Sequence, residues 1–333
     1  MTPGISFLAF FVGAVVSLVT SWVLVSRLER VGERLGLSEA LLGMVAAAAA
    51  DAPEVTASIT ALVHHQATIG AGVVLGSNVF NLAALLGLGA IVAGRIDLHR
   101  KVVVLGGTVA MLVAVVCLFT VGGQVPAGAG LAVVVAILVP YVILLGAHRS
   151  ILGRFGPATT WAAWLRDAIV EEETELAEAI HPRRGTGGDV LLAGAALVVV
   201  VAASIAMERG AASLGVHFAV PEIIVGGLVL AAVTSLPNAV SAIYLARRGR
   251  GAATLSTALN SNSLNVTAGL LIPAAIIGLA KPSESGILIA GWYLGLTALT
   301  LALAYSWRGL RRTSGGLIIA SYGLFVMVLL IVT

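Results

Sequence analysis

The chain of 333 residues is 59% hydrophobic and only 11% charged, and its mean hydropathy of +1.05 excludes a soluble globular domain and indicates an integral membrane protein. The formal net charge of +3 comes from basic residues at the ends of apolar segments, so no nucleic-acid partner is needed to explain it. The single cysteine, Cys117, excludes an internal disulfide and a cysteine-based metal site.

Apolar segments, each about long enough to cross a bilayer as a helix, follow one another along the chain. The first segment lacks a basic amino-terminal region and an A-x-A cleavage site, so we interpret it as a membrane helix and not as a signal peptide. The predicted fold is therefore an all-α integral membrane protein with ten transmembrane helices. The predicted spans are residues 4–26, 39–65, 69–93, 101–122, 126–147, 188–207, 221–246, 252–278, 284–306 and 315–332.

The positive charges predict how these spans are oriented. Of the 19 Lys and Arg residues, all but Arg209 and Lys281 follow odd-numbered spans. The positive-inside rule then places the odd-numbered loops in the cytoplasm and both termini outside. We expect a multi-pass protein of the plasma membrane, and the preference for Arg over Lys together with the Ala and Gly content indicates a prokaryotic source.

The second span contains two carboxylates, Asp51 and Glu54, in an otherwise uncharged apolar run. A carboxylate inside a membrane is energetically expensive and therefore indicates a functional site. Pro53 lies between the two acids, lacks the N–H that would bond the carbonyl near Ala49, and is expected to break the helix. A carbonyl freed in this way must be satisfied by protein, water or an ion. If the span is shifted along the chain, Asp51 lies instead at a water-filled mouth.

A polar stretch, GSNVFN, interrupts the third span. Ser77 and Asn81 are four residues apart and share a helix face, and Asn78 adds a further amide. Taken singly, such a residue is as well explained by a hydrogen bond to a neighbouring helix. His64 and His65 end the second span, and we interpret them as caps on the extracellular side, with a proton relay as the alternative.

Residues 148–187 form the only long loop of the predicted topology. Residues 167–178 within it are acidic and helix-prone, which favours a solvated amphipathic linker, with a cation-sensing regulatory segment as the alternative. His148 and His181 flank the loop without metal-ligand spacing, so we interpret them as surface residues.

The second half of the chain repeats the first at an offset of 184 positions. The offset aligns residues around the polar stretches, namely Gly43 with Gly227, Pro53 with Pro237, Ile59 with Ile243, Ser77 with Ser261, Asn78 with Asn262 and Asn81 with Asn265. Matches at one constant offset indicate an internal repeat. Because each half contains an odd number of spans, the halves must enter the membrane in opposite orientations. We divide the chain into a first five-helix repeat (1–147), a cytoplasmic linker loop (148–187) and a second, inverted five-helix repeat (188–333).

The polar residues of the two halves form an inventory of oxygen ligands. Pro237 is expected to free the carbonyl of Val233 as Pro53 does in the first half, and Ser261 and Asn265 share a helix face. Carboxylate, hydroxyl, amide and carbonyl oxygens suit hard cations such as Ca²⁺ or Na⁺ and suit Zn²⁺ or Cu²⁺ poorly. An inverted repeat with interrupted helices points to a transport site near the bilayer midplane.

At these residues the chain resembles the cation/calcium antiporter superfamily, the sodium/calcium exchangers of prokaryotic type. That superfamily has two alpha-repeats with a pattern like G-T-S-x-P-E followed by G-N-x-x-G-S-N-x-F-N. This chain reads ADAPE at 50–54 and GSNVFN at 76–81, then TSLPN at 234–238 and NSNSLN at 260–265. The resemblance implies two inverted five-helix repeats, with spans 1 and 6 sliding across a core of spans 2, 3, 7 and 8.

The resemblance also implies ion-coordinating roles for particular residues, namely Glu54, Ser77, Asn81, Thr234, Ser235 and Ser261. With Asp51 and the amides Asn78, Asn238 and Asn265, these make up the candidate cation site. The second repeat departs from the usual pattern, because Asn238 replaces an acid there. Asp51 replaces the usual Ser or Thr of the first repeat, so the negative charge has moved onto one half.

We therefore expect a secondary active antiporter that exchanges Ca²⁺ against Na⁺ or H⁺. The alternatives are a monovalent or other-cation/H⁺ exchanger that has lost Ca²⁺ selectivity, and a membrane protein that binds cations without transporting them. An intramembrane enzyme is disfavoured, because an aspartyl protease needs two aspartates at membrane depth and only Asp51 lies there, and because no H-E-x-x-H motif is present. No cofactor is expected, since the ions are substrates, and the expected partners are the lipid bilayer and small cations, with the chain acting as a monomer.

Overall fold

The computed structural model describes the chain except for residues 1, 38, 147–184 and 280, so the long loop with its acidic stretch lies outside the described residues. The described part is almost entirely helical. Seven of its helices are long and apolar enough to cross a membrane, and an eighth span results if the pair Glu222–Thr234 and Leu236–Arg247, bent by 46°, counts as one. The prediction of a helical membrane protein is confirmed, and the arrangement of ten spans stays a prediction.

The first half begins with the long helix α1 (Pro3–Leu35). The elements that follow are α2 (Glu39–Ala50), α3 (Ala52–Val63), α4 (Ala67–Asn81), the π-helix η1 (Leu82–Leu88), α5 (Gly89–Ala93), β1 (Arg95–Asp97), α6 (Arg100–Val121) and α7 (Ala127–Gly146).

The second half begins with another long helix, α10 (Gly187–His217). The elements that follow are α11 (Glu222–Ile224), η2 (Val225–Leu230), α12 (Ala231–Thr234), α13 (Leu236–Arg247), α14 (Gly251–Leu264), η3 (Asn265–Leu271), α15 (Ile272–Ile277), α16 (Glu284–Ser306), β2 (Gly309–Arg311) and α17 (Arg312–Val332). β1 and β2 pair in antiparallel fashion.

The prolines interrupt the helices where the sequence predicts. Helix α2 ends at Ala50 and α3 begins at Ala52, so Asp51 alone separates them, and Pro53 lies in the first turn of α3. Ser235 separates α12 from α13 in the same way, with Pro237 in the first turn of α13. A proline is tolerated in the first turn of a helix because the N–H it lacks has no partner there.

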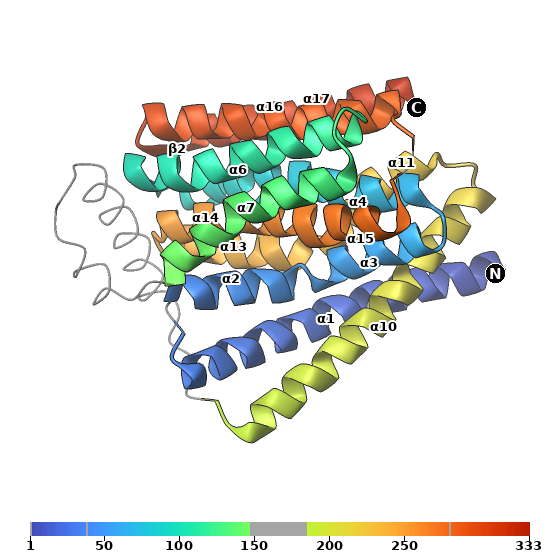
Figure 1. The fold of residues 1–333 in the computed structure, drawn as a ribbon, viewed down its shortest axis with the longest axis horizontal. Helices are drawn as coiled ribbons and strands as arrows, with labels where there is room; N and C mark the ends of the chain where they lie inside the picture. The colour runs from blue at the N-terminus through green and yellow to red at the C-terminus, as the bar shows by residue number, and fades with distance from the viewer. Residues whose placement is uncertain (1, 38, 147–184, 280) are drawn as a thin grey trace.

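Helices α1 and α10 pack against each other as a pair at one edge of the molecule (Figure 1). They approach closely where the sequence has glycine: a Cβ on Gly13 would lie 2.7 Å from the carbonyl oxygen of Ala203, and one on Gly210 would lie 2.6 Å from the backbone nitrogen of Phe10. Both helices are longer than predicted, because each continues beyond its apolar run through residues that still favour a helix.

The segment Ala67–Ala93 lies at the centre of the bundle, since 89% of its most apolar window is buried, against at most 39% in the other long spans. Helix α4 of this segment contacts the backbone of η2. A Cβ on Gly76 would lie 2.1 Å from the carbonyl oxygen of Gly227. Glycine at both positions allows the two halves of the chain to meet at backbone distance and brings their polar residues together.

Candidate functional site

The ten predicted site residues all lie buried in one region, where the interrupted helices α2–α3 and α12–α13 meet α4 and α14. None of them is more than 1% exposed: Asp51, Glu54, Ser77, Asn78, Asn81, Thr234, Ser235, Asn238, Ser261 and Asn265. A buried polar group must find a hydrogen-bond partner or a ligand. The contacts of each residue therefore show what it is free to do.

Asp51 is bonded by two donors from the second half of the chain. Its Oδ1 accepts a hydrogen bond of 2.6 Å from Asn238 Nδ2 and another of 2.6 Å from Ser261 Oγ. Its Oδ2 is buried and has no hydrogen-bond partner. Oδ1 is thus held by two protein donors, whereas Oδ2 has no donor, with the carboxyl group of Glu54 close to Asp51.

Glu54, in the first turn of α3, also accepts two hydrogen bonds, but one on each of its oxygens. Its Oε1 accepts a short hydrogen bond from Ser235 Oγ, and its Oε2 accepts one of 2.7 Å from Asn265 Nδ2. Both acids come from the first half, and all four of these donors come from the second half. The departure of Asn238 from the family pattern has a structural consequence, because its amide donates to Asp51 and no second-half acid takes part.

An amide cluster joins α4 to α14 beside the carboxylates. Asn78 Nδ2 donates to the carbonyl of Asn262 at 3.2 Å, and Asn262 Nδ2 donates back to the carbonyl of Asn78 at 3.1 Å. Asn81 Nδ2 donates to Asn262 Oδ1 at 3.0 Å and to Ser261 Oγ at 3.2 Å. Asn262 was not among the predicted site residues, although its position as the repeat partner of Asn78 is a signal that could have identified it.

Two hydroxyl groups of the predicted site donate hydrogen bonds to backbone carbonyls instead of to the carboxylates. Ser77 Oγ donates to the carbonyl of Ala231 at 3.4 Å, and Thr234 Oγ1 donates to the carbonyl of Leu230, one turn back in its own segment, at 2.8 Å. The carbonyl of Ala49, which Pro53 leaves free, accepts a hydrogen bond of 3.3 Å from Ser21 Oγ of α1. This carbonyl is thus satisfied by protein.

Four oxygen atoms in this region are buried without a hydrogen-bond partner: Asp51 Oδ2, Asn81 Oδ1, Asn238 Oδ1 and Asn265 Oδ1. All four are acceptors, and a buried acceptor without a donor is costly unless a ligand occupies it. In the described part of the chain, no group of three or more His, Cys, Asp or Glu is placed to hold a metal ion. The donor set is therefore two carboxylates with amide and hydroxyl oxygens, which suits a hard cation.

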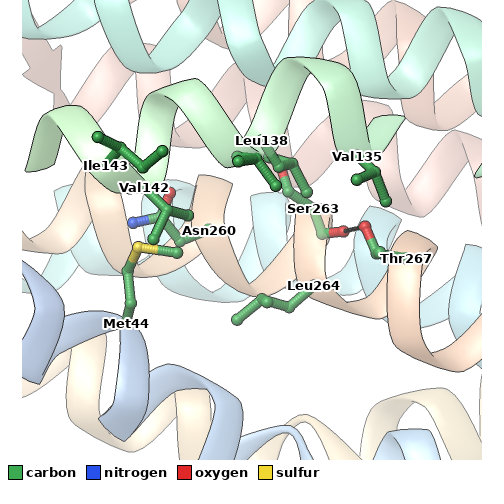
Figure 2. Close-up of a pocket in the computed structure, with 10 residues that line it drawn as sticks. Met44, Val135, Leu138, Val142, Ile143, Asn260, Ser263, Leu264 and Thr267 are labelled. Carbon is green, nitrogen blue, oxygen red and sulfur yellow. Dashed lines mark hydrogen bonds between the residues drawn. The ribbon is translucent and has the colours of Figure 1, made fainter. Parts of the chain in front are cut away.

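A cavity of about 290 Å³ lies against a different face of α14 (Figure 2). The polar side chains of Asn260, Ser263 and Thr267 line one wall, and apolar side chains of α7 with Met44 of α2 line the other. The two faces of α14 and η3 are distinct, since Ser261 of α14 and Asn265 of η3 lie on the face that meets the carboxylates. The cavity is therefore a neighbour of the site and not the site itself.

A bundle of apolar helices around a buried set of carboxylate, amide and hydroxyl oxygens is the arrangement expected of a membrane protein that handles cations. The sodium/calcium exchanger protein family matches this chain at residues 5–147 and 189–331. The chain therefore belongs to the sodium/calcium exchanger family, whose members are ion exchangers and not enzymes, and it is a multi-pass membrane protein.

Individual relatives agree with this assignment. The inner membrane protein YrbG of Escherichia coli strain K12 is 29% identical over 247 residues, which cover 72% of this chain and 70% of YrbG. The crystal structure of the H⁺/Ca²⁺ exchanger CAX has the same fold, with a TM-score of 0.74 at 14% identity over 98% of this chain and 82% of CAX. The sodium-calcium exchanger NCX_Mj, soaked with zero Na⁺ and Ca²⁺, has a TM-score of 0.58 at 19% identity over 98% of this chain and 99% of NCX_Mj.

Proposed function

We propose that this chain is a secondary active cation antiporter that exchanges Ca²⁺ against Na⁺ or H⁺ at the site around Asp51 and Glu54. The observation that carries the proposal is the set of four buried oxygens without hydrogen-bond partners, one on Asp51 itself and three on amides beside the two carboxylates. Two carboxylates neutralise one Ca²⁺, and carboxylate and amide oxygens are the ligands that Ca²⁺ prefers. We assign cation binding to the ten buried residues named above, with Asp51 and Glu54 supplying the charge.

The charge of the site limits the counter-ion. Three Na⁺ bound together against two carboxylates would leave a net charge of +1 in a buried site, which is unfavourable. One or two Na⁺, or protons on Asp51 and Glu54, keep the site near neutral. The two carboxyl groups also act on each other directly, so binding of a proton by one affects the other. The structures of similar fold are those of an H⁺/Ca²⁺ exchanger and a sodium-calcium exchanger, which is consistent with either counter-ion.

Alternating access at a midplane site is supported by the internal repeat. The bounds of the helices follow the offset of 184, since α3 (Ala52–Val63) corresponds to α13 (Leu236–Arg247) residue for residue and α1 and α10 begin at corresponding positions. We propose that residues 1–147 and 188–333 are two inverted repeats of five spans each, joined by the linker 148–187. By the positive-inside rule, both termini lie outside a plasma membrane; Figure 1 has both termini at the same end of the bundle.

A second candidate is a monovalent or other-cation exchanger coupled to H⁺. It is favoured by Asn238, whose amide donates to Asp51 at the position where the family usually has an acid. Replacement of Asn238 by Glu separates the two candidates. If the variant gains Ca²⁺ binding that the natural chain lacks, the second candidate is favoured.

The test of the proposal is uptake of Ca²⁺ into proteoliposomes that contain the purified chain, under an imposed Na⁺ gradient and, separately, an imposed pH gradient. Uptake under either gradient that is lost in the variant Glu54→Gln supports the proposal. Absence of Ca²⁺ uptake under both gradients refutes Ca²⁺ exchange. Binding of Ca²⁺ without flux under any gradient would instead favour a cation-binding protein that does not transport.

A further inference from the structure

Glu208 is a buried carboxyl group outside the candidate cation site. It lies in the second half of α10, is only 1% exposed, and has no hydrogen-bond partner for either Oε1 or Oε2. Its helix packs on α1, α3 and η2. A carboxylate buried without a donor or a counter-charge is strongly disfavoured against its protonated form.

Few titratable groups face Glu208. His64, at the end of α3, and Arg209, its neighbour in α10, are the charged or titratable groups that act on it. Along Pro3–Ser26 of α1 and throughout η2, no residue is titratable. The charged residues of α1 lie near its other end, where Arg27 pairs with Asp189 at 2.9 Å.

His64 and Arg209 are bonded to each other and not to Glu208. Arg209 Nη2 lies 2.8 Å from His64 Nε2, and His64 Nδ1 lies 2.7 Å from the carbonyl oxygen of Thr60. Because a guanidinium has no acceptor, His64 Nε2 accepts from Arg209 and Nδ1 carries the hydrogen. Both residues are exposed, whereas Glu208, on which both act electrostatically, is buried.

The internal repeat shows that packing alone does not require a carboxyl group here. The offset of 184 aligns Glu208 with Leu24 of α1, which is 2% exposed and packs among Ala49, Ala193 and Val200. The same structural position therefore holds an ordinary apolar side chain in the first half. Glu208 adds a titratable group to an interface whose counterpart has none.

We propose that Glu208 is a proton-binding site of this transporter, separate from Asp51 and Glu54, which exchanges its proton with solution past His64 and Arg209. A metal cation suits the position of Glu208 less well than a proton does, because a metal cation needs several oxygen ligands. Protonation at Glu208 acts on the packing of α10 against α3, the helix that carries Glu54. This coupling to transport rests on the proposed cation exchange, whereas proton binding at Glu208 does not.

The test uses infrared difference spectroscopy of the purified full chain between two pH values, with Glu208→Gln as the isosteric variant. Glu208→Leu copies the residue of the first repeat, and Glu222→Gln is the control at an exposed carboxylate. We expect the natural chain to have a pH-dependent carbonyl band of a protonated carboxyl group. The component of this band that Glu208 contributes should be lost in Glu208→Gln and Glu208→Leu and kept in Glu222→Gln. It should also be kept in the double variant Asp51→Asn/Glu54→Gln, which removes the contribution of the two site carboxyl groups. An unchanged band in both Glu208 variants would overturn the proposal.

Flux measurements separate this inference from the proposed function. In proteoliposomes, the exchange rate of the natural chain should vary with external pH by up to about tenfold per pH unit, the limit for one proton. Part of that dependence should be lost in Glu208→Gln. If the natural chain exchanges cations and the variant keeps the full pH dependence, Glu208 has no role in coupling and the proposal fails. If the natural chain shows no flux but the band is lost in Glu208→Gln, the cation-exchange proposal fails and the proton site stands.

Discussion

Replacement of Asp51 by Asn tests the candidate site most selectively. The amide oxygen of Asn can still accept the hydrogen bonds that Asp51 Oδ1 receives at 2.6 Å from Asn238 and Ser261. The change therefore keeps the two protein contacts but removes one negative charge and replaces the unpaired oxygen Oδ2 with an NH₂ group. An NH₂ group donates and cannot coordinate a cation.

The expected loss of Ca²⁺ affinity follows from the charge. The attraction between a carboxylate and Ca²⁺ at a ligand distance of about 2.4 Å is about 14 kcal/mol at an effective dielectric constant of 20. Desolvation of both charges offsets most of this. Even if four-fifths is offset, the remaining ~3 kcal/mol corresponds to an affinity about a hundredfold lower.

The assay is isothermal titration of the detergent-purified chain with Ca²⁺. Asp97→Asn is the matched control, since Asp97 is an exposed carboxylate that pairs with Arg95. We expect Asp51→Asn to weaken Ca²⁺ binding by about a hundredfold or more and Asp97→Asn to leave it unchanged. Equal affinities for the natural chain and Asp51→Asn would refute the assignment of Asp51 as a ligand.

Three further predictions follow from particular contacts. Gly76→Ala should strongly lower the midpoint temperature of thermal unfolding, because the new Cβ would lie 2.1 Å from the carbonyl oxygen of Gly227. Gly291→Ala is the control, since Gly291 has open space around it and the midpoint should not change. Equal midpoints for the two variants would contradict the close crossing of α4 and η2. Ser21→Ala should destabilise the chain by about 1–3 kcal/mol in denaturant unfolding, because the carbonyl of Ala49 loses its donor. Acidification should weaken Ca²⁺ binding, because protons compete for the two site carboxylates, and titration at several pH values checks the sign.

The helix breaks and the membership of the site could be predicted because their causes are local. Pro53 and Pro237 each follow polar residues in an apolar run, and each located a break, whereas Pro140 stays inside the continuous helix α7. The constant offset between the halves then paired residues distant in the sequence. The bundle brings Asp51 to Ser261 and Glu54 to Asn265, contacts between residues 210 and 211 positions apart.

The individual hydrogen bonds could not be predicted, because they depend on which helices meet and at what depth. Ser77 is directed to the backbone of Ala231, a contact set by the glycine crossing of α4 and η2. The donor to the carbonyl of Ala49 comes from Ser21 of α1, which no local pattern links to Pro53. Glu208 could likewise not be predicted as a site, since a single acid in a long apolar helix does not reveal from the sequence alone whether it faces lipid, water or protein.

The central claim is that the unpaired oxygens around Asp51 and Glu54 bind a cation. The most direct measurement is anomalous scattering from crystals of this chain soaked with Ca²⁺ or Sr²⁺. We predict a single strong peak within about 2.3–2.6 Å of Asp51 Oδ2 and of at least one of the amide oxygens of Asn81, Asn238 and Asn265. Absence of a peak there under saturating cation, or a peak only elsewhere in the bundle, would contradict it.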